Sequence, residues 1–406
     1  MSQIPSTIES GQQAPPTPAC INLDQASTSF PKAPGVAAAM ARFIEQGAYN
    51  ANRGSYGGAL ASDQLLFETR LQIAHFFEGK DPRHVIFSSG VTLSINQLLY
   101  GLLKEGDHVV TSSMEHNAVV RPLMRLARER GIEWSKVQAD RVGRIDPEAV
   151  KAAIRPNTRL ILMTAASNLV GTMTPLRAIG RIAREAGLFF AVDSAQLAGS
   201  RPLSMEKDQI DAICFTGHKA LLGPQGIGGM VLSPALAEVL EPVICGGTGS
   251  FSDLERMPAP YPDRMEAGTL PLPAIAGLHA ALHFLMEKGI DTLEAKKRET
   301  FRYLLSEMSK LPQIRLFGPT DPEAEDRVEV LAFQVAGQDS GAIAARLAER
   351  GILNRVGLHC APWAHKSVGS FPEGSIRFSV GYQQSKADMD QALDVLREIL
   401  DSPKRG

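Results

Sequence analysis

The sequence has few cysteines, no excess of charge of either sign and no long apolar run. Four cysteines occur in 406 residues, Cys20, Cys214, Cys245 and Cys360. They are too few for a disulfide scaffold and favour a reducing, cytoplasmic location. The formal net charge of -2 gives no electrostatic footprint for nucleic acid or an anionic membrane. No apolar run approaches the ~20 residues needed to span a bilayer. These absences favour small-molecule chemistry.

Several common binding motifs are also missing. The chain has no GxxxxGK[ST], no strand-placed GxGxxG with a following acidic partner, and no HExxH. His359, Cys360 and His365 in LHCAPWAH are possible metal ligands, but no second Cys or His pair supplies the usual zinc spacing. We therefore expect no metal ion.

The hydrophobic pattern predicts two folded regions after a flexible tail. Residues 1–20 are rich in Ser, Gln and Pro and lack the basic start and apolar run of a secretory signal. In residues 21–275, apolar runs such as HVIFSS, RLILMTAAS and AICFTG alternate with helical patterns, which predicts a large α/β domain with a mostly parallel sheet. A long helix around LPLPAIAGLHAALHFLMEKG leads into a smaller α+β domain, residues 276–406.

Polar residues follow several of the predicted strands. In parallel sheets ligands bind at the carboxyl ends of the strands, so these groups are expected to converge. Ser89-Gly90-Val91-Thr92 precedes a helix and suits a phosphate, although an ordinary N-cap is the alternative. Asp193 would pair with a protonated ring nitrogen, or would serve as a cap or in a buried salt bridge. His116 could stack on a ring or be a satisfied interior histidine.

Lys219 is the decisive residue of this set. An amine in a partly dry, cation-rich pocket becomes a nucleophile that can form a Schiff base. With a phosphate site and an acidic partner for a ring nitrogen nearby, pyridoxal 5'-phosphate (PLP) accounts for all three features.

At this point the residues resemble a known family. The chain is similar to the class V aminotransferase group of fold-type I PLP enzymes, and within it to the cysteine desulfurases and selenocysteine lyases. The resemblance runs from about residue 21 to 400 and is strongest in AVDSAQLAG, FTGHKALLGPQGIGG and NRVGLHCAP. It implies a large domain with a mostly parallel seven-stranded sheet between helices, and a smaller α+β domain that carries a cysteine loop.

The resemblance also implies a role for each matching residue. Lys219 would bind the cofactor covalently, Asp193 would pair with its ring nitrogen, Gln196 with its ring hydroxyl, and His116 would stack on the ring. Asn168 would border both cofactor and substrate, and Arg377, with Arg355 nearby, would bind the substrate carboxylate. The phosphate would be bound by Val91, Thr92, Thr216 and His218, with Thr269 reaching it from the second subunit of a homodimer.

The same resemblance implies that Cys360 is the sulfur-accepting nucleophile. L-cysteine would be converted to L-alanine, and the persulfide left on Cys360 would pass to a separate acceptor protein. The thiol must lose its proton to attack, and His359 and Arg355 are sequence neighbours that could help. The segment from Cys360 to Arg377 is short, as in relatives with a compact cysteine loop.

Two departures from the family pattern leave the substrate open. Leu93 stands where relatives often have an acidic residue, and Asn52 where they often have a histidine. One alternative is a selenocysteine lyase, or another PLP-dependent C–S lyase or aminotransferase, that does not use Cys360 covalently. The other is a non-catalytic binding protein that kept the fold.

Overall fold

The computed structural model describes residues 20–51 and 54–401. The predicted tail, apart from Cys20, and the departure at Asn52 therefore lie outside the described residues. Within the described ranges, no helix is both long enough and apolar enough to cross a membrane.

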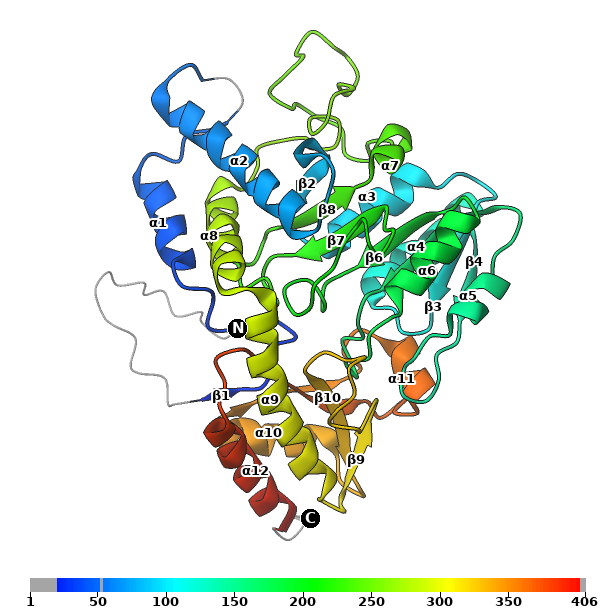
Figure 1. The fold of residues 1–406 in the computed structure, drawn as a ribbon, viewed down its shortest axis with the longest axis vertical. Coiled ribbons are helices and arrows are strands. Elements are labelled where there is room, and N and C mark those ends of the chain that lie inside the picture. Colours follow the sequence, from blue (N-terminus) through cyan, green and yellow to red (C-terminus); the bar gives the residue numbers. More distant parts are fainter. Residues whose placement is uncertain (1–19, 52–53, 402–406) are drawn as a thin grey trace, which may run out of the picture.

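A seven-stranded sheet forms the centre of the larger part of the molecule (Figure 1). Its strand order is β2-β8-β7-β6-β5-β3-β4. Only β8 is antiparallel to its neighbours, so the predicted mostly parallel seven-stranded sheet is confirmed. The strands span Val85–Ser88 (β2), His108–Ser112 (β3), Glu133–Val137 (β4), Thr158–Thr164 (β5), Phe189–Asp193 (β6), Ala212–Thr216 (β7) and Gly228–Leu232 (β8).

Both faces of this sheet are covered by helices, which explains its continuous apolar strands. Successive side chains of a strand point to opposite faces. In β7, Ile213 and Phe215 belong to one hydrophobic core, and Ala212 and Cys214 to the other. The first core includes side chains of α1 (Val36–Glu45), α2 (Gly57–Phe76), α5 (Pro147–Ala152), α6 (Leu176–Glu185) and α8 (Leu272–Lys288). The second includes side chains of α3 (Val91–Leu102), α4 (Asn117–Arg130) and α7 (Pro234–Val239).

The predicted connecting helix is present as α8, and its four periodic apolar residues are fully buried: Ile275, Leu278, Leu282 and Leu285. The chain then passes through Gly289, whose φ of 77° lies in the region that favours glycine, and continues as α9 (Ile290–Ser309). Figure 1 shows α8 beside the large sheet and α9 beside the smaller part.

The smaller part combines a four-stranded antiparallel sheet with α9, α10 (Ser340–Glu349) and α12 (Lys386–Asp401). The buried apolar side chains of α11 (Pro362–Val368) belong to a core of the large sheet. Its strand order is β12-β13-β10-β9, with bounds Ile314–Phe317 (β9), Val330–Val335 (β10), Arg355–Gly357 (β12) and Ser375–Ser379 (β13). A separate parallel pair joins β1 (Ile21–Asn22) to β11 (Ile352–Leu353). The amino-terminal segment therefore packs on the carboxy-terminal part of the chain.

Candidate active site

A cavity of about 280 Å³ lies at the carboxyl ends of the sheet strands. It brings together most of the residues that the sequence singled out, although they come from five separate segments. The lining includes Val91, Thr92, His116, Asn168, Asp193, Gln196, Thr216, His218 and Lys219. Convergence of these polar groups is what the strand-end rule predicts for a mostly parallel sheet.

The entry to α3 is open to an anion. The residue before the helix is Gly90, which has no side chain to cap the first turn, and its φ is 145°. The ordinary side-chain cap considered above is therefore not what this helix has. The N–H groups of an uncapped first turn and the helix dipole both favour a negative group.

The start of β8, which follows the glycine-rich turn after Lys219, lies close to the entry of α3. Gly228 begins β8, and a Cβ added there would lie 2.7 Å from the Cα of Gly90. Real Cβ contacts are not that short, so a larger residue would push β8 away from the α3 entry. Thr216 and Gly90 are held together as a result.

Lys219 follows β7 and faces the cavity. Its side chain is only half-buried overall, but protein atoms surround its amine. Burial lowers the pKa of Lys219 to about 8; Arg377 and Arg355 lower it further, while Asp193 and Cys360 oppose the shift. A lysine with such a pKa is available as a nucleophile and base near neutral pH.

Two histidines of the cavity are held neutral. His116 is the N-cap of α4: its Nδ1 accepts from the Ala118 N–H at 3.0 Å, which leaves the ring proton on Nε2. Burial lowers the pKa of His116, and it lowers the pKa of His218 to about 4, helped by the charges of Lys219 and Lys32. Among the described residues, the buried Nδ1 of His218 has no hydrogen-bond partner, so a donor or acceptor is left over beside the α3 entry.

Asp193 ends β6 and is 2% exposed. Its Oδ1 accepts from the Ala195 N–H at 3.0 Å. Gln196 lies in the same segment, and its Nε2 donates to the Ala26 carbonyl at 3.0 Å, so it also contacts the amino-terminal segment.

Glu115 is a second buried carboxyl group next to this set. It accepts hydrogen bonds from the Ser112 hydroxyl at 2.5 Å and the Thr164 N–H at 2.9 Å. Complete burial raises the pKa of Glu115 to about 8, and the nearby charge of Asp193 adds to the shift. Glu115 is therefore protonated at neutral pH.

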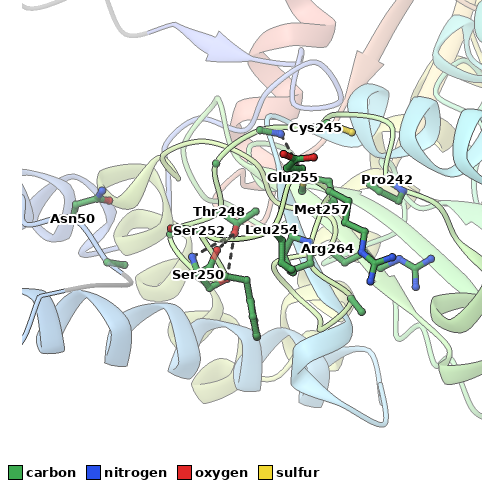
Figure 2. Close-up of a pocket in the computed structure, with 18 of the residues that line it drawn as sticks. Asn50, Pro242, Cys245, Thr248, Ser250, Ser252, Leu254, Glu255, Met257 and Arg264 are labelled. Atoms are coloured by element: carbon green, nitrogen blue, oxygen red, sulfur yellow. Dashed lines mark hydrogen bonds between the residues drawn. The ribbon is translucent and has the colours of Figure 1, made fainter.

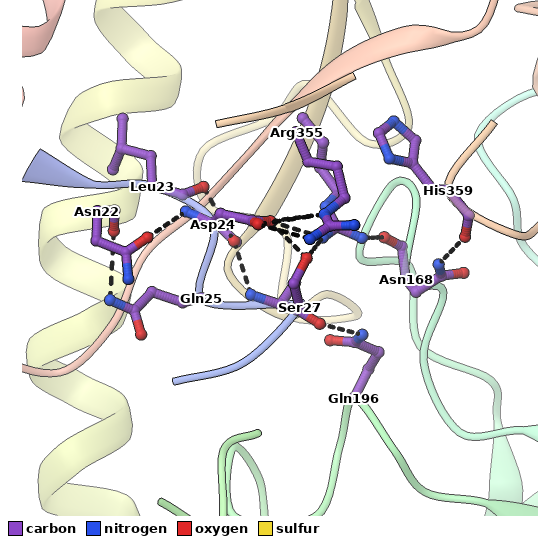
Figure 3. Close-up of polar contacts among 12 residues, drawn as sticks. Asn22, Leu23, Asp24, Gln25, Ser27, Asn168, Gln196, Arg355 and His359 are labelled. Carbon is purple, nitrogen blue, oxygen red and sulfur yellow. Dashed lines mark hydrogen bonds and ion pairs between the residues drawn. The ribbon is translucent and has the colours of Figure 1, made fainter. Parts of the chain in front are cut away.

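Arg377, Arg355 and Cys360 belong to the smaller part, and none of them is among the residues that line this cavity. Arg377 is buried in β13, and its Nη1 donates to the Asn168 carbonyl at 2.8 Å. Arg355 is half exposed in β12 and is opposite Arg377 in the antiparallel pair. Both arginines form ion pairs with the carboxylate of Asp24, a residue that the sequence did not single out. Figure 3 shows the contact of Arg355 with Asp24.

Cys360 is exposed at the start of a tethered loop. Its carbonyl accepts from the Asn117 N–H at 2.8 Å, and the His359 carbonyl accepts from Asn168 Nδ2 at 2.7 Å (Figure 3). Both residues have positive φ, 46° and 55°, which costs non-glycine residues about 1–3 kcal/mol each. Asn117 and Asn168 therefore tether the strained backbone of this loop to the larger part of the molecule.

The side chain of His359 does not supply a positive charge to this thiol. It is buried, its Nε2 bonds to the Ser375 carbonyl at 3.0 Å, and it stacks on His365. Burial lowers the pKa of His359 to about 3, so the ring is neutral at physiological pH. His359 therefore offers the thiol no positive charge, whereas Arg355 and Arg377 are cations of the same part of the molecule.

Thr269 lies away from these residues in a single subunit. It is exposed and lines a different cavity together with residues 50–51, 247–249 and 268. A wider cavity of about 1280 Å³ adjoins it, between the loop 241–264 and residues 50, 51, 54 and 56 (Figure 2). Its lining contains Cys245 but neither Lys219 nor Asp193, so we place the chemistry in the smaller cavity, whose lining contains both of them.

Comparison with known proteins agrees with this geometry. The model of the family "Aminotransferase class-V" matches residues 21–392. A probable cysteine desulfurase of Methanothermobacter thermautotrophicus is 32% identical over 93% of this chain and 94% of its own. A cysteine desulfurase of Yersinia pestis is 30% identical, over 88% of each chain.

Two solved structures have the same architecture. The apo structure of a cysteine desulfurase from Thermococcus onnurineus matches with a TM-score of 0.88 at 26% identity, over 94% of each chain. The cysteine desulfurase CsdA from Escherichia coli matches with a TM-score of 0.83 at 28% identity, over 94% of this chain and 95% of its own.

Fold and site define a fold-type I PLP-dependent enzyme. The chain belongs to the class V aminotransferase family. The predicted fold class, family and cofactor are thereby confirmed.

Proposed function

We propose that this protein is a cysteine desulfurase that converts L-cysteine to L-alanine and carries the sulfur on Cys360. The carrying observation is that the exposed thiol of Cys360 belongs to a loop whose backbone is tethered to Asn168, a residue that lines the cavity with Lys219 and accepts from Arg377. The names of the similar proteins support the same activity.

The residues of the cavity suit PLP. Its phosphate would be held by the uncapped first turn of α3, Thr216 and the unpaired nitrogen of His218. Asp193 would face the ring nitrogen, Gln196 the ring hydroxyl and His116 the ring face, while Lys219 would bind covalently. When bound, PLP withdraws electrons from the amino acid attached to it and so weakens bonds at the α-carbon.

The protein would contribute three functions of its own. Arg377 would orient the substrate carboxylate, since a guanidinium fork fits that planar anion. Lys219, with a pKa of about 8, would take the α-proton. The Cys360 thiolate would attack the substrate sulfur: an S–S bond forms, the substrate Cβ–S bond breaks with its electron pair going to carbon, and Cβ is protonated to give alanine.

The exposure of Cys360 supports transfer of the persulfide to an acceptor protein. We also propose a homodimer. Exposed apolar side chains support it: Tyr49, Tyr56, and Leu60, Phe67 and Leu71 on α2. They lie on the segments before and within α2, and Thr269 would reach a partner's cofactor from the exposed segment before α8. All four cysteines are free, which supports the cytoplasm as location.

The test is alanine and persulfide formation from L-cysteine by the holoenzyme and by Cys360→Ala. Persulfide transfer to an added thiol should be lost in Cys360→Ala while the cofactor absorbance is kept. Cys245→Ala is the matched control, because Cys245 is also exposed but lines the other cavity. Unchanged sulfur release by Cys360→Ala would favour a lyase that does not use this thiol.

A further inference from the structure

The carboxylate of Asp24 joins the two arginines of the substrate side. Its oxygens accept from Arg355 Nε at 3.2 Å and Nη2 at 3.1 Å, and from Arg377 Nη2 at 3.1 Å. The Ser27 hydroxyl donates to the same carboxylate at 2.6 Å. Figure 3 shows Asp24 and Ser27 of the amino-terminal segment beside Arg355.

Arg377 has one N–H donor without a hydrogen-bond partner in the described part of the chain. Its Nη1 reaches the Asn168 carbonyl, and its Nη2 is shared by Asp24 and Ser27. Its Nε is buried and has no hydrogen-bond partner among the described residues. A buried guanidinium with an unpaired N–H, which contacts the cavity residue Asn168, is suited to one further anionic oxygen.

Asp24 is fixed by the backbone rather than by the arginines alone. The Leu23 carbonyl accepts from the Ser379 N–H at 2.7 Å, and the Ala26 N–H donates to Ser379 Oγ at 2.8 Å. Arg377 and Ser379 are two apart in β13, so they face the same side of that strand. The carboxylate is therefore held at a set position relative to Arg377.

Asp24, Arg355 and Arg377 together carry one net positive charge. Arg355 and Arg377 carry two positive charges, and Asp24 neutralises one of them. One positive charge remains, enough to balance one substrate carboxylate. A second carboxylate on the ligand would meet Asp24 without a free cation, and like charges placed together at a binding site are strongly unfavourable.

We propose that Asp24 is a specificity-determining residue that restricts the site to amino acids with a single carboxylate and excludes dicarboxylic amino acids. The proposal rests on the proposed function, since it takes Arg377 as the group that binds the substrate carboxylate. The competing interpretation is that Asp24 only ties the amino-terminal segment to β13.

The experiment measures binding of L-alanine and L-aspartate to the holoenzyme by calorimetry, so it does not depend on turnover. The wild type should bind L-aspartate at least about tenfold more weakly than L-alanine. In Asp24→Asn, which keeps the shape of the side chain, that ratio should fall by about tenfold or more. Ser27→Ala removes the other partner of Arg377 Nη2 without changing charge, and its ratio should stay within about twofold of wild type.

Several results would overturn the proposal. One is equal affinity of the wild type for both amino acids; another is an unchanged ratio in folded Asp24→Asn. Arg355→Gln covers the case in which Asp24→Asn does not fold, because Arg355 is half exposed. The Arg355→Gln substitution leaves Asp24 and Arg377 with no net positive charge between them, so L-alanine binding should weaken by about tenfold. Unchanged L-alanine binding would contradict the charge balance. Alanine formation from L-cysteine by the wild type is measured separately, and its absence would reject the proposed function whatever the binding ratio.

Discussion

The two halves of the site are built in different ways. The cofactor half, defined as His116, Asp193, Thr216, His218 and Lys219, lies at the ends of neighbouring strands in one sheet. The substrate half, defined as Asp24, Arg355, Cys360 and Arg377, joins the amino-terminal segment to the smaller part of the molecule.

The difference lies in what fixes each half. Strand pairing fixes the cofactor half, whereas ion pairs and loop tethers over long sequence separations fix the substrate half. Substitutions should therefore separate the two: changes in the first half should alter cofactor binding, and changes in the second should alter substrate handling alone.

The largest effect is expected for Lys219→Ala. Loss of the amine removes both the covalent link to the cofactor and the base, so alanine formation should fall by about 10³-fold or more. The visible absorbance of the cofactor–lysine Schiff base should disappear as well. Lys32→Met is a control, because Lys32 is another lysine whose pKa is lowered to about 8 but which does not line the cavity. Retained Schiff-base absorbance in Lys219→Ala would contradict the assignment.

Arg377→Lys should affect substrate binding and leave the cofactor in place. The charge is kept but the planar fork is lost, and the KM for L-cysteine should rise by about 10- to 100-fold with little change in the absorbance spectrum. Steady-state kinetics and a spectrum of the same sample check this. A loss of cofactor without a change in KM would mean that the two halves are not separable.

A smaller effect is expected for the change with pH in the rate at which the apoprotein captures PLP. Only the neutral amine of Lys219 attacks the cofactor aldehyde, and its pKa is about 8. The rate at which the apoprotein captures PLP should therefore rise about tenfold per pH unit up to that value and then level off. Stopped-flow absorbance checks it. A rise that continues to the ~10.4 of an ordinary lysine would show that burial does not act as described.

The smallest effect on activity is expected for Glu115→Gln. At neutral pH Glu115 is already uncharged, so alanine formation should stay within about threefold of wild type. The free energy of unfolding of Glu115→Gln should differ more from that of the wild type than its activity does. The pKa is raised on folding, so the wild type loses stability as pH rises from the unfolded value near ~4.3 to about 8.

As pH rises from ~5 to ~8, the melting temperature of the wild type should therefore fall relative to that of Glu115→Gln. Thr111→Val, at a buried hydroxyl that has no partner among the described residues, is a control that should show no such pH trend. A constant difference between Glu115→Gln and wild type would mean that Glu115 is ionised in the folded protein.

The sequence predicted the cofactor half far better than the substrate half. Apolar strands that end in Asp193 or Thr216 carry their signal in a few consecutive residues, and the strand-end rule places them together. β4 was missed, because it lies at the sheet edge and Glu133, Ser135 and Lys136 give it a polar sequence. Edge strands need not be apolar on both faces.

Asp24 could not be found in the same way. It follows the short strand β1 and pairs with arginines 331 and 353 residues away. No local pattern encodes such a pairing, and only the packing of the amino-terminal segment on β13 creates it. For His359 the sequence correctly indicated proximity to Cys360, but side-chain direction and burial depend on contacts with Ser375 and His365 that sequence spacing does not specify.

The most direct test of the central claim is the mass of the peptide that contains Cys360 after the holoenzyme reacts with one equivalent of L-cysteine without reductant. The account predicts the gain of one sulfur atom on that peptide, none on the peptide that contains Cys245, and one alanine for each sulfur bound. Alanine formed in full with an unmodified Cys360 peptide would contradict it.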